Sequence, residues 1–119
     1  MMGYYLFLDD IRFPKDVKWI DIPSQNWQIV RSYDEFINFI EKNGIPYFIS
    51  FDHDLSSEHY SNSETDELEK TGFHAAKWLI EYCIENNLEI PEYAVHSMNP
   101  IGKQNIISIM EQGKRFQSK

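Results

Sequence analysis

Three apolar runs of this sequence end abruptly in side chains that bind metal ions, transfer protons or contact phosphate. These side chains are Asp9 and Asp10 after residues 4–8, Asp52, His53 and Asp54 after residues 47–51, and His96, Ser97 and Asn99 after residues 93–95. In an open parallel α/β sheet the carboxyl ends of the strands line one crevice, and ligands bind in that crevice. The sequence therefore predicts one polar, acid-rich pocket at one edge of a sheet.

The aspartates of this cluster predict a site for a divalent cation. Carboxylates held close together repel one another, and such an arrangement persists mainly when a cation or a shared proton relieves the repulsion. Hard oxygen ligands suit Mg²⁺ or Mn²⁺, whereas participation of His53 and His96 would allow a softer transition metal. The structural alternative for Asp9 and Asp10 is that they cap a turn, as aspartates often do.

His53 and His96 are the candidates for proton transfer. Histidine as a residue type changes charge near neutral pH, so it is the usual general acid or base there. The alternative is that each imidazole only hydrogen-bonds a nearby carbonyl group. His74 is expected on the polar face of a helix as a surface residue, and His59 receives no role.

Two predicted helix starts and one arginine could contact phosphate. The start at Asn99 and Pro100 and the start at Thr71 and Gly72 both expose backbone amides, which bind anions. The same residues are equally consistent with ordinary helix starts. Arg12 could hold a phosphate through two parallel hydrogen bonds, or it could pair with the acidic residues that precede it.

Four short apolar segments are predicted as strands, at residues 4–8, 27–31, 47–51 and 93–96. The first is apolar throughout, a pattern typical of a strand buried on both faces. Helices alternate with the strands, which implies a small parallel sheet covered on both faces by helices. Right-handed crossovers place the three polar strand ends on one edge of this sheet.

The first predicted helix has the clearest boundaries. Ser32 and Glu35 form a capping box at its start, an apolar stripe follows at helical spacing, and Gly44 ends it. The second helix is predicted over residues 71–86. The last helix is followed by a polar tail from Gly113, which we expect to fray.

Two long segments are predicted to lack regular structure. Residues 11–26 contain two prolines and no helical stripe, so we expect an irregular connection with one short turn around residues 16–20. Residues 55–70 form a long acidic loop, of a length that is usually functional or disordered. This loop is a candidate lid over the pocket.

The composition indicates a single domain over residues 1–119. Hydrophobic residues make up 42% of the chain, which is enough for a core without disulfides or a structural metal. The single cysteine, Cys83, cannot form an internal disulfide and is expected in the core. No apolar run approaches the length of a membrane span, so we expect a cytoplasmic protein that does not bind membranes.

The net charge limits the partners. A charge of −8 opposes broad, non-specific binding of nucleic acid, because such a surface repels a long phosphate backbone. A phosphorylated small molecule or an RNA end remains an acceptable partner, and the sequence names no protein partner.

Four motifs in order resemble a known family. They are LFLDD at 6–10, ISFDHDL at 49–55, TG at 71–72 and VHSMNPIG at 95–102. Together with Arg12 and Asn105 they resemble the cyclic-phosphate processing receiver-like domain, a divergent relative of two-component receivers, over nearly the whole chain. The resemblance implies a receiver-like (flavodoxin-like) three-layer α/β sandwich with a mostly parallel four-stranded sheet. It also implies a role with cyclic phosphate ends in RNA repair or end processing.

The ordinary receiver is similar enough to serve as a partial template. By that resemblance Asp9, Asp10 and Asp52 hold Mg²⁺, Asp52 is the position that a signalling receiver phosphorylates, and Ser97 matches its hydroxyl residue. The sequence lacks the fifth strand with its lysine, and Lys103 is not in an equivalent place. Phosphorelay signalling is therefore disfavoured, and the added histidines favour hydrolysis.

We therefore expect a metal-assisted phosphoesterase acting on an RNA 2′,3′-cyclic phosphate end or a related cyclic phosphodiester. The expected roles are catalysis by His53, His96 and Asp54, substrate binding by Arg12, Thr71, Ser97 and Asn99, and binding of Mg²⁺ or Mn²⁺ by Asp9, Asp10 and Asp52. A metal-free variant with the two histidines as an acid–base pair stays open. The main alternative is a non-catalytic receiver-like module that binds a phosphorylated nucleotide or a partner protein, and a third is a receiver phosphorylated at Asp52.

Overall fold

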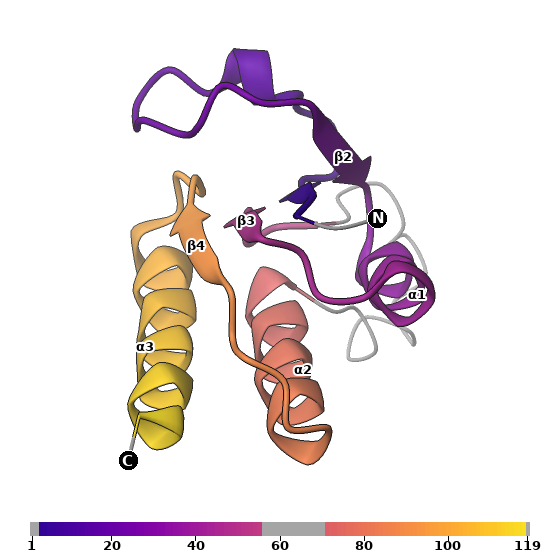
Figure 1. Cartoon of the computed structure of the whole chain (residues 1–119). Helices are drawn as coiled ribbons and strands as arrows, with labels where there is room; N and C mark the ends of the chain where they lie inside the picture. Colours follow the sequence, from indigo (N-terminus) through magenta and orange to yellow (C-terminus); the bar gives the residue numbers. More distant parts are fainter. Residues whose placement is uncertain (1–2, 56–70, 119) are drawn as a thin grey trace, which may run out of the picture.

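The computed structural model describes residues 3–55 and 71–118, which form a four-stranded parallel sheet packed against helices (Figure 1). The strands lie in the order β2-β1-β3-β4, and all neighbours are parallel. Their bounds are Tyr5–Leu8 for β1, Trp27–Val30 for β2, Phe48–Phe51 for β3 and Glu92–Val95 for β4. This arrangement confirms the predicted receiver-like α/β fold class.

The central strand β1 is buried on both faces. Leu6 and Leu8 belong to the main hydrophobic core, and Phe51 of β3 lies in register beside Leu8. Phe7 points to the opposite face, where its ring packs edge-on against Trp27 of β2, and it has no exposed surface. The continuous apolar sequence of β1 follows from this double burial.

All three α-helices of the described residues lie on the same face of the sheet (Figure 1). Their bounds are Tyr33–Asn43 for α1, Gly72–Glu85 for α2 and Pro100–Gln117 for α3. The helix α2 packs against both of the others, and the three apolar faces close the main core over the sheet. Right-handed crossovers produce this arrangement, because β2 to β3 and β3 to β4 step across the sheet in the same direction.

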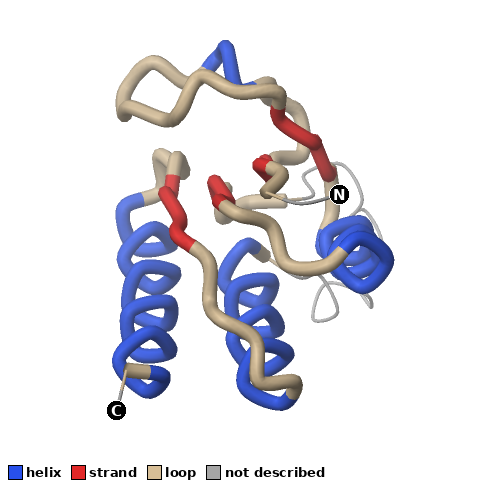
Figure 2. The backbone as a smooth tube through the Cα atoms, viewed as in Figure 1, coloured by secondary structure: helices blue, strands red, loops and turns tan. Residues whose placement is uncertain are grey.

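The opposite face is covered by the segment 9–26, which contains one 3₁₀ helix, η1 at Pro14–Asp16 (Figure 2). The prediction of helices on both faces of the sheet is wrong for the described residues. On this face the described chain contains a single short 3₁₀ helix instead. It begins slightly before the turn predicted at residues 16–20. The segment stays irregular because prolines interrupt it and it has no apolar stripe that a helix could bury.

The capping signals of α1 act as the sequence predicts. Ser32 Oγ accepts the Glu35 amide at 3.1 Å, and Glu35 Oε1 in turn accepts the Arg31 amide at 2.8 Å. Gly44 ends the helix with φ +90°, a left-handed conformation that favours glycine. The strand β3 then begins four residues later and delivers Asp52.

The prediction of a frayed tail from Gly113 is wrong, because α3 continues to Gln117. Gly113 is buried, and the side chains of Ile80 and Ile90 occupy the space that a Cβ atom at this position would need. The Gln117 side chain accepts the Ile90 amide at 2.9 Å and donates to the Leu88 carbonyl at 2.7 Å. These tertiary contacts hold the last turn, which a polar sequence by itself would leave unsupported.

The acidic loop predicted as a lid at residues 55–70 lies outside the described residues, apart from Leu55, which belongs to the main core. Among the helices that the structure describes, none combines the length and the apolar character needed to cross a bilayer.

Gly72 allows the start of α2 to approach the end of β3. A Cβ atom at Gly72 would lie 1.7 Å from the Asp52 carbonyl oxygen, whereas the nearest atom to a Cβ at Gly113 is Cδ1 of Ile80, at 2.5 Å. A side-chain tip can move more easily than a backbone carbonyl.

We expect Gly72→Ala to lower the free energy of unfolding by ~3 kcal/mol or more, and Gly113→Ala by ~1 kcal/mol, in urea denaturation. Equal losses in the two variants would contradict this explanation.

Candidate functional site

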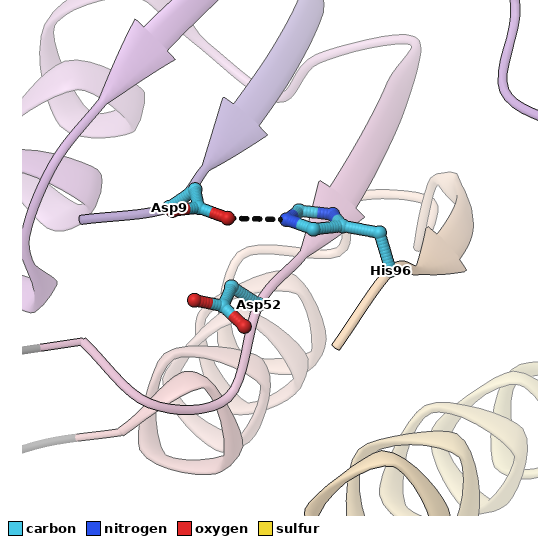
Figure 3. Close-up of side chains that lie close together, drawn as sticks. All are labelled: Asp9, Asp52 and His96. Atoms are coloured by element: carbon cyan, nitrogen blue, oxygen red, sulfur yellow. Dashed lines mark hydrogen bonds and ion pairs between the residues drawn. The ribbon is translucent and has the colours of Figure 1, made fainter. Parts of the chain in front are cut away.

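Three buried side chains meet at the carboxyl edge of the sheet: Asp9, Asp52 and His96 (Figure 3). The strand pairing continues one residue past the strands, since the amides of Asp52 and His96 donate to the carbonyls of Leu8 and Phe51, both at 2.9 Å. One ligand atom from each of the three side chains lies within 4.8 Å of the others. The three strand ends thus converge as the sequence predicts.

Asp9 is completely buried, and both of its carboxylate oxygens are hydrogen-bonded. Oδ1 accepts the amides of Ile11 and Arg12 at 2.9 and 2.8 Å, and Oδ2 lies 2.9 Å from Nε2 of His96. Burial alone would raise the pKa of Asp9, but the hydrogen bonds from His96 and the two amides outweigh it and lower the pKa to about 2. Asp9 therefore caps a turn, the alternative that we considered, and at the same time carries a fixed negative charge in the cluster.

His96 is fully buried, and both of its ring nitrogens are engaged. Nε2 faces Asp9, and Nδ1 lies 2.7 Å from Oγ of Ser50 in β3. The ring stacks on Phe7 with centroids 4.5 Å apart and planes 5° from parallel, while Trp19 donates its indole N–H to the His96 carbonyl at 2.9 Å. This arrangement orients Asp9, and it leaves no ring nitrogen of His96 open for the proton transfer that we predicted.

Asp52 is also buried, at 5% exposure, but its electrostatic situation is the reverse of that of Asp9. Burial and the negative charge of Asp9 raise the pKa of Asp52 to about 7, against a hydrogen bond from the His53 amide. Asp10 adds to the rise through its charge, although its carboxylate lies outside the three-residue cluster. The predicted ligand set of Asp9, Asp10 and Asp52 is thus brought together only in part, with His96 in addition.

The cluster fits a divalent cation. A buried carboxylate that resists ionisation beside a second, charged carboxylate gains from any cation placed between them. Two carboxylates with one imidazole suit Mn²⁺ or a similar transition ion, and the carboxylates alone suit Mg²⁺. His96 could act as a ligand through Nε2 only with its proton on Nδ1, where Ser50 Oγ would accept it. The structure thus holds a group of side chains that could bind a metal, whose identity it leaves open.

His53 is the more accessible histidine. Its Nδ1 lies 2.9 Å from Asp54 Oδ1, and its ring packs on Gly102 in the first turn of α3, where an added Cβ would lie 2.4 Å from the ring. The His53 side chain is 17% exposed and that of Asp54 is 71% exposed. Asp54 orients the ring through Nδ1, and no hydrogen bond to the Nε2 atom of His53 is found within residues 3–55 and 71–118.

The residues predicted to bind substrate at the helix starts act as caps. Asn99 Oδ1 accepts the Gly102 amide at 3.0 Å, Ser97 Oγ accepts the Asn99 amide at 3.1 Å, and Thr71 Oγ1 accepts the Phe73 amide at 3.2 Å. These contacts match the alternative of ordinary helix starts. Contact with a substrate remains a prediction for Ser97, Asn99 and Thr71.

His74 is a second capping residue rather than an isolated surface histidine. Its Nδ1 accepts the Thr71 amide at 3.0 Å, the place that glutamate takes in the usual capping box.

Arg12 connects Asp9 of the cluster with the exposed side chains of Trp19 and Met98. Its Nη1 lies 3.7 Å from Asp9 Oδ2, so the pairing considered as an alternative is present. The guanidinium also lies over the Trp19 ring, 5.2 Å from its centroid, and Nη2 is 3.8 Å from the Met98 sulfur. With 33% of its side chain exposed, Arg12 keeps surface for an anion.

Ser50 and Arg31 are among the residues that support the site and that the sequence analysis missed. Ser50 contacts His96, and its signal was a hydroxyl in the middle of an apolar strand. Arg31 donates through Nη1 to the carbonyls of Asp9 and Arg12, at 3.0 and 2.6 Å, and so fixes the chain that follows β1. No local sequence pattern predicts the hydrogen bonds of Arg31, because its partners lie about twenty residues away along the chain.

Removal of the Ser50 hydroxyl tests the buried contact with His96. In Ser50→Ala the Nδ1 atom of His96 loses its partner in a site without water access, so we expect a loss of ~1–3 kcal/mol in the free energy of unfolding. Ser108→Ala, at an exposed position of α3, serves as the control and should change it by less than ~0.5 kcal/mol. A loss no larger than that of the control would show that the contact contributes little.

The raised pKa of Asp52 predicts how stability depends on pH in the absence of metal. The folded state holds the Asp52 proton more tightly than the unfolded chain, so this residue lowers stability as pH rises from the ordinary carboxyl range to about 7. Asp52→Asn removes that cost. In EDTA we expect the variant to exceed the wild type by ~2–4 kcal/mol near pH 8 and by far less near pH 5.

Urea denaturation at several pH values measures this difference. Measurements above about pH 5 exclude any contribution from the ionisation of Asp9. Because the pKa of Asp9 is lowered, its stabilising effect on the folded state is lost only as pH falls through the acid range towards 2. Mn²⁺ should stabilise the wild type and should stabilise Asp52→Asn much less. A pH-independent difference between the two proteins would show that Asp52 ionises normally.

Comparison with known sequences identifies the family. The sequence profile of the cyclic-phosphate processing receiver domain matches residues 4–112. No curated protein and no solved structure gave a significant match. The matched region includes the four strands that the structure describes, the helices α1 and α2, α3 as far as residue 112, and the cluster of Asp9, Asp52 and His96. The chain therefore belongs to the cyclic-phosphate processing receiver domain family.

Proposed function

We propose that this protein hydrolyses a cyclic phosphate, either the 2′,3′-cyclic phosphate of an RNA end or a related cyclic phosphodiester, with the help of a divalent cation. One observation carries the proposal. Two buried carboxylates and an imidazole gather within 4.8 Å at the carboxyl edge of the sheet, in a family described as processing cyclic phosphates. The carboxylates repel a negatively charged phosphate. A bound cation would make the electrostatic potential of the site positive and would attract the phosphate.

Asp9 and Asp52 are the residues that would hold the cation, with Asp10 close by and His96 behind Asp9. A divalent ion held by these residues would polarise phosphoryl oxygens and would make water a better nucleophile. His96 and Ser50 keep the Asp9 carboxylate in one orientation, so that it does not have to be ordered when a ligand arrives. Arg12 supplies positive charge to the phosphate from the side of the segment 9–26.

His53 is the residue that we propose for proton transfer. Its Nε2 takes a proton from the attacking water as the new P–O bond forms, and gives it to the ribose oxygen that leaves when the ring P–O bond breaks. The products are a phosphate monoester and a free hydroxyl, so one water is consumed. Asp54 positions the imidazole through Nδ1, the usual way in which a carboxylate orients a catalytic histidine.

An oligonucleotide with a 2′,3′-cyclic phosphate end tests the proposal. The full chain is incubated with it in Mg²⁺, in Mn²⁺ and in EDTA, and mass spectrometry shows whether the ring opens to a monoester. We expect opening with metal and none in EDTA. Asp52→Ala and His53→Ala should each lower the rate by ~10²-fold or more.

Two further variants sharpen the result. His74→Ala removes a histidine of α2 that caps the helix, and it should leave the rate within ~2-fold if the fold is intact. His96→Ala should lower metal affinity as well as rate, because it releases Asp9. Activity in EDTA would support the metal-free acid–base alternative.

Saturable binding of the oligonucleotide without product would identify a non-catalytic binding module. An unchanged and unbound substrate under every condition would refute the proposed substrate class.

A further inference from the structure

The exposed large apolar side chains of the described residues gather at two ends of the molecule. Five of the eight lie in the segments that follow β1 and β4, up to the first turn of α3. These five are Ile11, Phe13, Trp19, Met98 and Ile101. The other three lie before β3 or near the carboxyl ends of α2 and α3, away from the candidate site: Tyr47, Leu88 and Phe116. The larger group therefore belongs to the same two segments as Asp9 and His96.

Arg12 connects these apolar side chains to the acidic cluster. Its guanidinium contacts Asp9 at 3.7 Å, lies 5.2 Å from the centre of the Trp19 ring and reaches the Met98 sulfur at 3.8 Å. We define the apolar rim as Trp19 and Met98, which contact Arg12, together with the other exposed apolar residues of the same two segments, Ile11, Phe13 and Ile101. Trp19 is 38% exposed and Met98 is 62% exposed, so both offer surface beside the cation. A phosphate held by Arg12 would carry the rest of its molecule onto this rim.

We propose that the apolar rim binds the base of the nucleotide whose cyclic phosphate lies at Arg12 and the acidic cluster. The inference rests on the proposed function and names its substrate class as a nucleotide rather than any cyclic phosphodiester. An aromatic ring and a thioether are surfaces on which a base packs, and stacking on an aromatic ring stabilises a bound base whatever its identity.

The size and charge of the surface favour one nucleotide over larger partners. A stable protein interface takes about 20–30 residues a side, and the rim has five. A long strand is opposed by the net charge of −8. Two arginines contact aromatic rings of the rim. Arg12 lies over Trp19, whereas the Arg31 guanidinium lies 4.7 Å from the centre of the Phe13 ring and already donates to two carbonyls. The arrangement suits one phosphate with one base.

The test compares two compounds that share the cyclic phosphate and differ in the base. They are adenosine 2′,3′-cyclic phosphate and 1-O-methylribose 2′,3′-cyclic phosphate, titrated by calorimetry in Mn²⁺ into a His53→Gln chain that cannot turn them over. We expect the adenosine compound to bind ~10-fold more tightly. Met98→Ser should reduce that preference by ~5-fold, and Met98→Leu should preserve it.

Phe116→Ser, at an exposed apolar position far from the site, is the matched control and should leave both affinities unchanged. Trp19 is left intact because its indole N–H holds the His96 carbonyl, so its loss would disturb the cluster itself. A Met98→Ser variant that weakens both compounds equally would overturn the inference.

The outcomes separate this inference from the proposed function. Opening of both compounds by the wild type with equal affinity would overturn the base site alone and leave the hydrolase intact. Failure of both compounds to bind would overturn the base site and the proposed function together. Self-association of the wild type that Met98→Ser abolishes, without any preference for the base, would assign the rim to a second copy of the chain and also overturn the base site.

Discussion

The structure of the site depends on one buried chain of hydrogen bonds, from Asp9 through His96 to Ser50. It joins the end of β1 to the end of β4, two strands that are not neighbours, by passing over β3. All three residues have no exposed surface, so any polar atom left without a partner would cost free energy comparable to a lost hydrogen bond. Full satisfaction of the chain therefore fixes one arrangement of the three strand ends.

The same constraint shapes the second face of the sheet. The second oxygen of Asp9 holds the amides of Ile11 and Arg12, and Arg31 from the end of β2 holds the carbonyls of Asp9 and Arg12. The segment 9–26 therefore leaves β1 in a direction set by the buried carboxylate, although it has no regular structure of its own beyond η1. Its Trp19 donates to the His96 carbonyl, so an irregular segment is tied to the cluster at its start and again at Trp19.

The other half of the site is set by close approach of backbone. The start of α2 lies against the Asp52 and His53 backbone, where the Gly72 amide donates to the His53 carbonyl at 2.8 Å, and the His53 ring lies on Gly102 of α3. The sequence shows the strand ends and helix starts because their signals are local: an apolar run that ends in aspartate, or a serine three residues before a glutamate. It does not show that His96 faces inward, because its partners are 46 and 87 residues away. The same limit explains the missed Arg31 and the wrong end of α3, which distant contacts decide.

The two carboxylates of the cluster have opposite properties, and this difference indicates how a cation would bind. Asp9 is charged at neutral pH because both of its oxygens are hydrogen-bonded, whereas Asp52 holds its proton up to about pH 7 because burial and Asp9 oppose its ionisation. A cation that enters the cluster must displace the Asp52 proton, so its affinity is coupled to that one ionisation. Asp52 is also the member of the three that retains exposed surface, and His53 follows it directly in the chain. The ligand whose ionisation is coupled to the cation and the histidine proposed for proton transfer are therefore consecutive residues of the chain. Asp9 and His96 form the rigid, buried side of the site behind them.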